Sequence, residues 1–271
     1  MDFGEMKAAA ESALATAREE EGYSLGLQAF KYGYPAIEMH RSRWEWHFDD
    51  TSPNYNGPIN QLGHARRATH EDRFVVTPIN DAVYSRAFLD LTAEPQVVEV
   101  PEIPDRYWTV QLCDFYTNSF AYIGRRLGDG AGSYALVGPG WRGVLPAGIA
   151  RAITTPTPVI SVLARVAILD DDEAAAAALQ HRFRTTPLSS WRGEPADAAP
   201  HRTPQQYRDF KSGDPLDFYR MLNWCLTENP PPAWDAGALG LFERIGIAPG
   251  VDFEPAQLHP ATVRGMERAI P

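Results

Sequence analysis

The chain has few positive charges and no long apolar run. Its 271 residues include 25 Lys and Arg against 35 Asp and Glu, a formal net charge of -10, and the basic pairs Arg66-Arg67 and Arg125-Arg126 are isolated. Because phosphate binding requires clustered basic side chains, we expect no nucleic-acid partner. No window approaches about 18 consecutive apolar residues, so we expect no membrane span. The segment Met1–Lys7 lacks a basic stretch leading into an apolar one, which favours a cytoplasmic protein.

Cysteine is also scarce. The two cysteines, Cys113 and Cys225, lie far apart in apolar segments, which favours buried thiols over a disulfide framework. A nucleophilic Cys113 is an alternative, although the adjacent carboxylate of Asp114 disfavours the thiolate.

Motifs for cofactors and metals have little support. The sequence contains no Gly-Lys-Ser/Thr phosphate loop. A Gly-x-Gly-x-x-Gly spacing occurs at Gly138–Gly143, where we expect only a tight turn, and a Gly-x-Ser-x-Gly spacing occurs at Gly22–Gly26, within a predicted helical stretch and not at the strand-to-helix turn of a nucleophile elbow. His40 and His47 would lie about 10 Å apart along a helix, too far to share one ion. His64 and His70 lack the i, i+4 spacing of a helical metal site. We therefore expect no cofactor and no metal.

Short apolar runs separated by Pro and Gly turns dominate the middle of the chain. Their β-branched and aromatic residues are typical of strands. The runs predict strands at 74–77, 83–91, 96–100, 107–112, 120–124, 134–138, 150–154 and 159–167. This spacing predicts a central antiparallel β-sandwich or roll, which we place at residues 73–168.

Helical patterns flank this core on both sides. Residues 5–39 form two helical stretches, with a break or kink expected at Tyr34-Pro35. Asp170-Asp171-Asp172-Glu173 precedes an Ala-rich run and predicts a helix start. After a polar connector from Thr186 to Pro204, further helices are expected near 215–228, 234–245 and 260–269. The fold class is α+β, in a single domain of residues 1–271 with helices at 1–47 and a mainly helical part at 170–271.

Two strands combine apolar residues with polar ones that can hold a ligand. In strand 83–91 the alternation puts Tyr84 and Arg86 on a mixed face, opposite small and apolar residues. In strand 107–112, Gln111 lies on the face opposite Trp108 and Leu112. If those apolar residues are core, Gln111 enters a polar layer, because buried amides require partners.

Polar turns follow or precede the same strands, and each has two interpretations. Asp114, Tyr116 and Asn118 either share the polar layer of Gln111 or cap a turn through bonds to the backbone. Asn80 and Asp81 have the same ambiguity. If their turn faces a cavity, Asp81 and Tyr84 lie close enough for a general acid and base.

A third candidate region lies near the end of the first helical part. Arg43 and Trp44 could bind an anionic or planar ligand by guanidinium pairing and stacking. The alternative is a solvated helix end beside core tryptophans.

With these blocks in view, the chain resembles the bacterial domain-of-unknown-function family 1254. The resemblance spans most of residues 23–255, and the Asn-Asp-x-x-Tyr-Ser block at Asn80–Ser85 is its most specific part. Other matching stretches are Asn60 to Arg66, Leu89-Asp90-Leu91 with Glu94-Pro95, Asp105-Arg106-Tyr107, Asp114 to Asn118 and the strand that contains Arg165. Members commonly carry a second, jelly-roll domain, and we expect this chain to be a single-domain member without it. The resemblance implies a fold and a site location more than a reaction.

The leading hypothesis is a cofactor-free enzyme that carries out proton transfer on a small, largely apolar molecule, as a cyclase, isomerase or lyase does. Asp81 or Asp114 would act as acid or base and Tyr84 or Tyr116 as second proton donor. Asn80, Gln111, Asn118, Arg43, Trp44, Arg86 and Arg165 would bind or orient the substrate. Two alternatives stay open: a non-catalytic module for a small molecule or glycan, and an assembly subunit that forms a homo-oligomer.

Overall fold

The computed structural model describes residues 2–72, 79–194 and 202–271, and they confirm the α+β class. They form two compact units. The helical unit comprises Met1–His40 and Gln205–Pro271, and the β-rich unit comprises Arg41–Pro204. The helices are α1 (Phe3–His47), α2 (Glu173–Gln180), α3 (Leu188–Trp191), α4 (Asp217–Glu228), α5 (Ala236–Phe242) and α6 (Pro260–Ala269). None of these described helices is long and apolar enough to cross a membrane.

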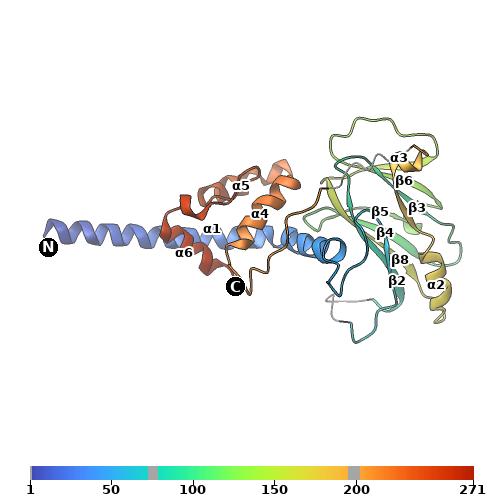
Figure 1. Cartoon of the computed structure of the whole chain (residues 1–271), viewed down its shortest axis with the longest axis horizontal. Helices are drawn as coiled ribbons and strands as arrows, with labels where there is room; N and C mark the ends of the chain where they lie inside the picture. Colours follow the sequence, from blue (N-terminus) through green and yellow to red (C-terminus); the bar gives the residue numbers. More distant parts are fainter. Residues whose placement is uncertain (1, 73–78, 195–201) are drawn as a thin grey trace. The chain divides into compact units, whose positions relative to one another are not determined.

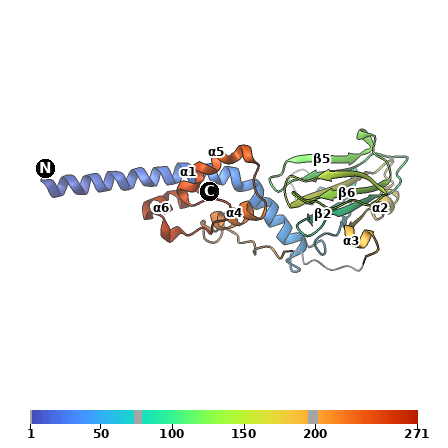
Figure 2. The ribbon, with the colours of Figure 1, turned by 90° about the horizontal axis from the view of Figure 1, so that it is seen from above.

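The β-rich unit contains two sheets. Its strands are β1 (Gly63–Ala65), β2 (Ala82–Asp90), β3 (Gln96–Val100), β4 (Trp108–Cys113), β5 (Ser119–Gly124), β6 (Gly132–Val137), β7 (Ile149–Thr154), β8 (Val159–Ala167) and β9 (Arg184–Pro187). The first sheet has the order β1-β2-β8-β4-β5 and is antiparallel throughout. The second has the order β7-β6-β3-β9, in which β6 and β7 run parallel. Figures 1 and 2 show the strands of this unit from two directions.

The hydrophobic core lies between the two sheets. Residues of β2, β4 and β8 alternate between core and the opposite face, as the period-two pattern predicts. Val110, Leu112 and Val162 from the first sheet cluster with Val98 and Leu136 from the second. Each of these five side chains is fully buried. The face of the first sheet that points toward the second sheet therefore forms the core, and Gln111 and Arg165 lie on its opposite face.

Most predicted strands are confirmed, and the exceptions are short or lie outside the described residues. The predicted strand at 74–77 is among the residues that the structure does not describe. β1 was not among the predicted strands. β9 overlaps the start of the expected connector from Thr186 to Pro204, and α3 lies within that connector. Each depends on a distant partner, since β1 pairs with β2 and β9 pairs with β3.

In the helical unit, α1 continues through Pro35. Of the two expected alternatives, the break is therefore wrong, and the kink stays a prediction. A proline inside a helix removes one hydrogen bond and costs about 3 kcal/mol. Burial of the two residues that follow Pro35 offsets this cost, because Ala36 and Ile37 are fully buried. Gly33 lets α4 approach closely, since a Cβ at Gly33 would lie 2.6 Å from Cδ1 of Leu222. In Figure 1, α4, α5 and α6 lie along α1.

The predicted helix start after Asp170 is confirmed by the cap of α2. The carboxylate of Asp172 accepts a hydrogen bond from the Ala175 backbone at 3.0 Å. Glu173 occupies the first turn, where the helix dipole favours a negative charge. Ala176 of this helix packs into the core of the β-rich unit, so α2 closes one side of that core.

His47, near the end of α1, joins a loop to the first sheet. Its Nδ1 lies 2.8 Å from the carbonyl oxygen of Gly57, and its Nε2 accepts a hydrogen bond from the Phe88 backbone at 2.9 Å. Since a carbonyl only accepts, Nδ1 carries the proton and the ring is neutral. Burial, with smaller contributions from the charges of Arg43 and Arg86, lowers the pKa of His47 to about 4. His47 is therefore a structural connector.

Candidate functional site

Asp81 and Asp114 lie at opposite ends of the first sheet. β2 and β4 both pair antiparallel with β8, so they run in the same direction. Asp81 precedes the start of β2, whereas Asp114 follows the end of β4. The length of β8 separates the two ends, on the order of 25 Å at about 3.3 Å per residue. The two carboxylates therefore cannot act on one small substrate.

Asp114 caps the turn between β4 and β5. Its carboxylate accepts hydrogen bonds from the backbone of Tyr116 at 2.9 Å and of Asn118 at 2.9 Å, and from the Asn118 amide at 3.0 Å. The backbone of Asn118 in turn accepts from the Asp114 amide. This is the turn interpretation left open in the sequence. Asn80 and Asp81 are exposed, and their carbonyl oxygens accept bonds from Arg67 and Ile168.

Tyr84, Gln111 and Arg165 are brought together on the face of the first sheet opposite the core. Arg165 donates to Gln111 Oε1 at 2.8 Å, and Gln111 donates to the Ser119 hydroxyl at 2.6 Å. The Arg165 guanidinium lies 5.5 Å from the centre of the Tyr84 ring. Gln111 thus has partners in a polar layer, which it shares with Arg165 and Ser119.

Arg43, Trp44 and Arg86 make contacts within the protein. Arg43 is fully buried, and its Nη2 lies 3.9 Å from a carboxylate oxygen of Asp90. Trp44 stacks on Phe48 with 6.1 Å between ring centres. The Arg86 guanidinium lies 4.3 Å from the centre of the Trp46 ring. Arg43 therefore points into the protein, toward Asp90.

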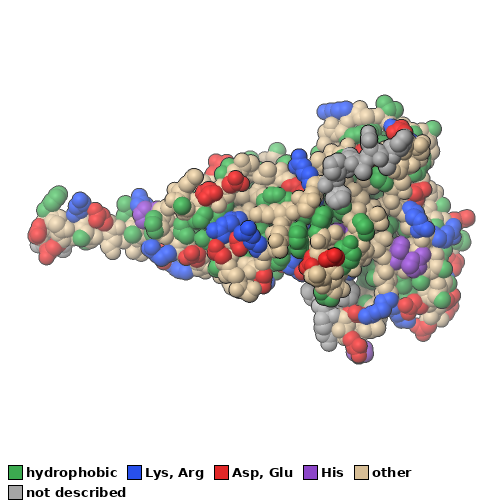
Figure 3. Space-filling view, in the orientation of Figure 1, with side chains coloured by type: hydrophobic (Ala, Val, Ile, Leu, Met, Phe, Trp, Pro, Cys, Tyr) green, Lys and Arg blue, Asp and Glu red, His purple; other side chains and the backbone are tan. Residues whose placement is uncertain are grey.

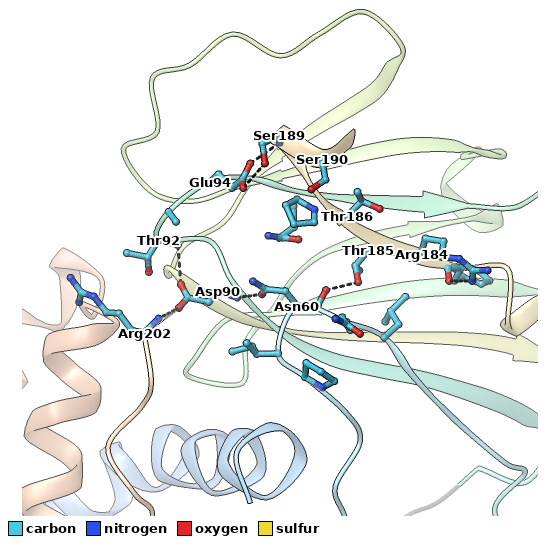
Figure 4. A pocket seen from close by; sticks show the side chains of 18 of the residues that line it. Asn60, Asp90, Thr92, Glu94, Arg184, Thr185, Thr186, Ser189, Ser190 and Arg202 are labelled. Atoms are coloured by element: carbon cyan, nitrogen blue, oxygen red, sulfur yellow. Dashed lines mark hydrogen bonds between the residues drawn. The ribbon is translucent and has the colours of Figure 1, made fainter. Parts of the chain in front are cut away.

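A cavity of about 630 Å³ lies elsewhere in the β-rich unit. Three stretches build it: the segment around Asn60, the end of β2 with the turn to β3, and β9 with α3 (Figure 4). Its polar and charged lining residues are Asn60, Gln61, His64, Asp90, Thr92, Glu94, Gln96, Arg184, Thr185, Thr186, Ser189, Ser190 and Arg202. This volume is typical of sites for small molecules.

Hydrogen bonds tie the three stretches together. Asn60 Oδ1 accepts from the Asp90 backbone at 2.7 Å, and the Asn60 carbonyl accepts from the Thr185 hydroxyl at 2.7 Å. The Glu94 carboxylate accepts from the backbone of Ser189 at 2.7 Å and from its hydroxyl at 2.9 Å. Asn60 has a φ of 67°, a left-handed conformation that asparagine tolerates better than most residues. The cavity wall is thus held in one arrangement.

Charged and titratable groups line the same cavity. Asp90 is 4% exposed and accepts from the backbone of Thr92 at 2.9 Å and of Arg202 at 3.3 Å. His64 Nδ1 lies 2.8 Å from the Ser85 hydroxyl. Burial and the nearby charges of His181 and Arg184 lower the pKa of His64 to about 4, so this imidazole is neutral at pH 7. Figure 3 shows histidine with Lys and Arg beside it at the surface of the β-rich unit.

The cavity was not among the sites expected from the sequence. A signal was present, because the stretches Asn60 to Arg66, Leu89-Asp90-Leu91 and Glu94-Pro95 carry the family resemblance and lie at the cavity. Asp90 also ends a strand of buried residues, where a carboxylate is costly unless it has partners. No group of three or more His, Cys, Asp or Glu side chains with metal-binding geometry occurs within residues 2–72, 79–194 and 202–271.

Fold and cavity together define a two-sheet β domain with a small-molecule-sized polar site. Residues 59–187 match the family described as "Protein of unknown function (DUF1254)", so this segment is similar to the family that the sequence resemblance named. Most cavity residues lie in the matched segment; those outside it are Pro58, Ser189, Ser190 and Arg202.

One solved structure has a similar fold. The VPA0106 protein of Vibrio parahaemolyticus matches with a TM-score of 0.70 and 22% identity, over 92% of this chain and 57% of that protein. The chain thus spans little more than half the length of this neighbour. An uncharacterised protein of Burkholderia cenocepacia matches at a TM-score of 0.34 and 18% identity, over 49% of this chain and 36% of its own. No curated protein matches the sequence.

Proposed function

We propose that the β-rich unit binds a small hydrophilic molecule in the cavity around Asn60, Asp90 and Glu94. The supporting observation is a cavity of about 630 Å³ whose walls carry hydroxyl, amide, carboxylate and guanidinium groups. Small-molecule sites fall between about 300 and 1,000 Å³ and orient their ligands with a few placed polar groups. This cavity supports the alternative of a small-molecule or glycan module.

The lining favours a hydrophilic ligand over the largely apolar substrate expected from the sequence. Thr92, Thr186 and Ser190 offer hydroxyl groups, and Phe183 is the aromatic residue among the lining residues. Phe183 is 1% exposed, so it offers no stacking surface. Trp108 is 2% exposed in the core, so it offers no stacking surface either.

A matched pair of variants tests this proposal. Ala93 lines the cavity and Ala152 lies in β7 outside it, and both are exposed in the β-rich unit. Ala93→Trp should fill the cavity and abolish thermal stabilisation by any ligand found in a screen of small polar molecules, whereas Ala152→Trp should not. Equal ligand binding by both variants would place the site elsewhere and refute the proposal.

Acid–base catalysis in the same cavity is a second candidate. His64, neutral at pH 7, lines the cavity together with the carboxylates of Asp90 and Glu94, and such groups are the usual proton carriers in enzymes. His64→Gln and Glu94→Gln should then remove turnover of a bound ligand and leave its affinity within about threefold. Unchanged turnover in both variants would exclude catalysis at these groups.

The remaining predictions concern location and partners. We propose a cytoplasmic protein with a small-molecule ligand and with neither nucleic acid nor membrane as partner, on the basis of the net charge of -10 and the lack of long apolar runs. A homo-oligomer stays an alternative, for which sedimentation of a strict monomer would be the contrary result.

A further inference from the structure

The Gln96 side chain in the cavity wall has no hydrogen-bond partner among the residues that the structure describes. Gln96 is 2% exposed, and its Oε1 is buried without a donor. A buried amide left without partners costs about 1–3 kcal/mol. The side chains of Asn60, Asp90 and Glu94 accept hydrogen bonds within the cavity wall. Gln96 is the amide whose hydrogen-bonding requirement is unmet.

The requirement of Gln96 specifies the kind of ligand group that fits. A primary amide offers a donor and an acceptor side by side, whichever way the amide is turned. It is satisfied by a group that can both accept and donate. Hydroxyl groups do so, and neighbouring hydroxyls of a sugar or polyol match the amide at two positions. The nearby hydroxyls of Thr186 and Ser190 suit the same chemistry.

The charges around the cavity favour a ligand that is also an anion. Arg184 and Arg202 line the cavity, and neither has a carboxylate partner among the described residues. Asp90 is compensated by Arg43 behind it. With Asp90 compensated by Arg43, the two cations Arg184 and Arg202 that line the cavity outnumber the remaining anion, Glu94. An arginine guanidinium is well suited to bind a carboxylate through paired hydrogen bonds.

We propose that the ligand is a small polyhydroxylated carboxylate, of the sugar-acid class. Its hydroxyl groups bond the Gln96 amide, and its carboxylate pairs with Arg202 at the cavity edge. This inference rests on the proposed binding function and specifies its ligand class. Figure 4 shows Arg202 and Arg184 at opposite ends of the cavity, which leaves the hydroxyl-rich wall between them.

Calorimetric titration with matched sugars tests the ligand class. D-Glucuronate should bind about tenfold or more tightly than D-glucose, and lactobionate should exceed lactose by a similar factor, because each pair differs by a carboxylate. Arg202→Met should remove this preference and leave glucose binding unchanged. Gln96→Met should weaken every sugar about tenfold or more.

The ligand-free stability of Gln96→Met separates a binding role from a structural one. Met is close in size to Gln and carries no unmet amide, so the melting temperature of the ligand-free variant should be equal or higher. A lower melting temperature with unchanged binding would mean that the amide is structural, and it would overturn the inference.

Other results distinguish the ligand class from the cavity itself. If a ligand without hydroxyls or without a carboxylate binds best and Ala93→Trp blocks it, the sugar-acid class is refuted and the cavity proposal stands. If the sugar acids bind and Ala93→Trp does not block them, both proposals fail.

Discussion

Replacing His47 by Gln should flatten the pH dependence of stability in the β-rich unit between pH 6.5 and 4. His47 is 5% exposed and its pKa in the folded protein is about 4, against the ordinary histidine value of 6.5. Between these values the unfolded chain binds more protons, so the free energy of unfolding falls as the pH is lowered. The contribution is fully present above pH 6.5 and is lost as the pH approaches 4.

The size of the effect follows from the shift. The pKa of His47 differs by about 2.5 units between the unfolded and the folded chain, and each unit corresponds to about 1.36 kcal/mol. The neutral ring therefore contributes at most about 3 kcal/mol to the free energy of unfolding, of which about 2 kcal/mol is lost between pH 6.5 and 5. Gln can donate to the Gly57 carbonyl and accept from the Phe88 backbone without titrating. His47→Gln should therefore lose about 2 kcal/mol less than the wild type between pH 7 and 5.

The measurement is urea unfolding at pH 7 and pH 5, with hydrogen exchange of the Phe88 amide as a local probe. Exchange of this amide should accelerate toward pH 4 in the wild type, beyond the intrinsic pH effect, because protonated Nε2 no longer accepts. His70→Gln, at an exposed position, is the matched control and should follow the wild type. If His47→Gln falls as steeply as the wild type, or if His47 titrates near 6.5, the reasoning is refuted.

Three further predictions concern the turn cap, the helical unit and the buried ion pair. Asp114→Asn should lower the free energy of unfolding by about 1–2 kcal/mol and accelerate hydrogen exchange of the Asn118 amide, since Asp114 bonds its own turn. Ligand affinity at the cavity should not change, and a loss of affinity alone would contradict this reasoning. Gly33→Ala should destabilise the helical unit by about 1–3 kcal/mol in thermal unfolding, because the added Cβ would meet Leu222 at 2.6 Å. Leu222→Ala in the same chain should recover part of the loss, and unchanged stability of Gly33→Ala would argue against this close approach. Arg43→Met should lower the free energy of unfolding in urea by about 3–5 kcal/mol, because it leaves the buried Asp90 carboxylate without its arginine. Asp90→Asn in the same chain should restore part of this free energy, and additive losses in the double variant would contradict direct coupling.

Strands were predictable where local pattern and packing agree. The predicted runs 96–100 and 159–167 coincide with β3 and β8, because period-two alternation states which face is buried. Pro35 illustrates the opposite case. A local rule predicts a break or a kink there, and the helix continues without a break because Ala36 and Ile37 are buried. β9 has no apolar alternation, and its pairing with β3 depends on a partner more than eighty residues earlier.

The candidate site was less predictable, for a topological reason. Whether Asp81 and Asp114 meet depends on strand order, and β8 inserts between β2 and β4 although it is much later in sequence. An Asp after a strand also satisfies either a turn or a ligand, and the residue type alone does not distinguish them. The cavity joins segments near residues 60, 90 and 185, whose proximity exists only in the folded sheets.

The late position of β8 has a consequence for how the protein is made. β8 pairs with β2 along all nine residues of each strand and with β4 along six. The first sheet therefore lacks its central strand until Ala167 has been synthesised. Until then, a nascent chain exposes the apolar faces of β2 and β4 and their unpaired edges, which invite association with other chains. Such long-range pairing also slows folding. Protection of the growing chain by chaperones should therefore matter most between the emergence of Asp90 and that of Ala167.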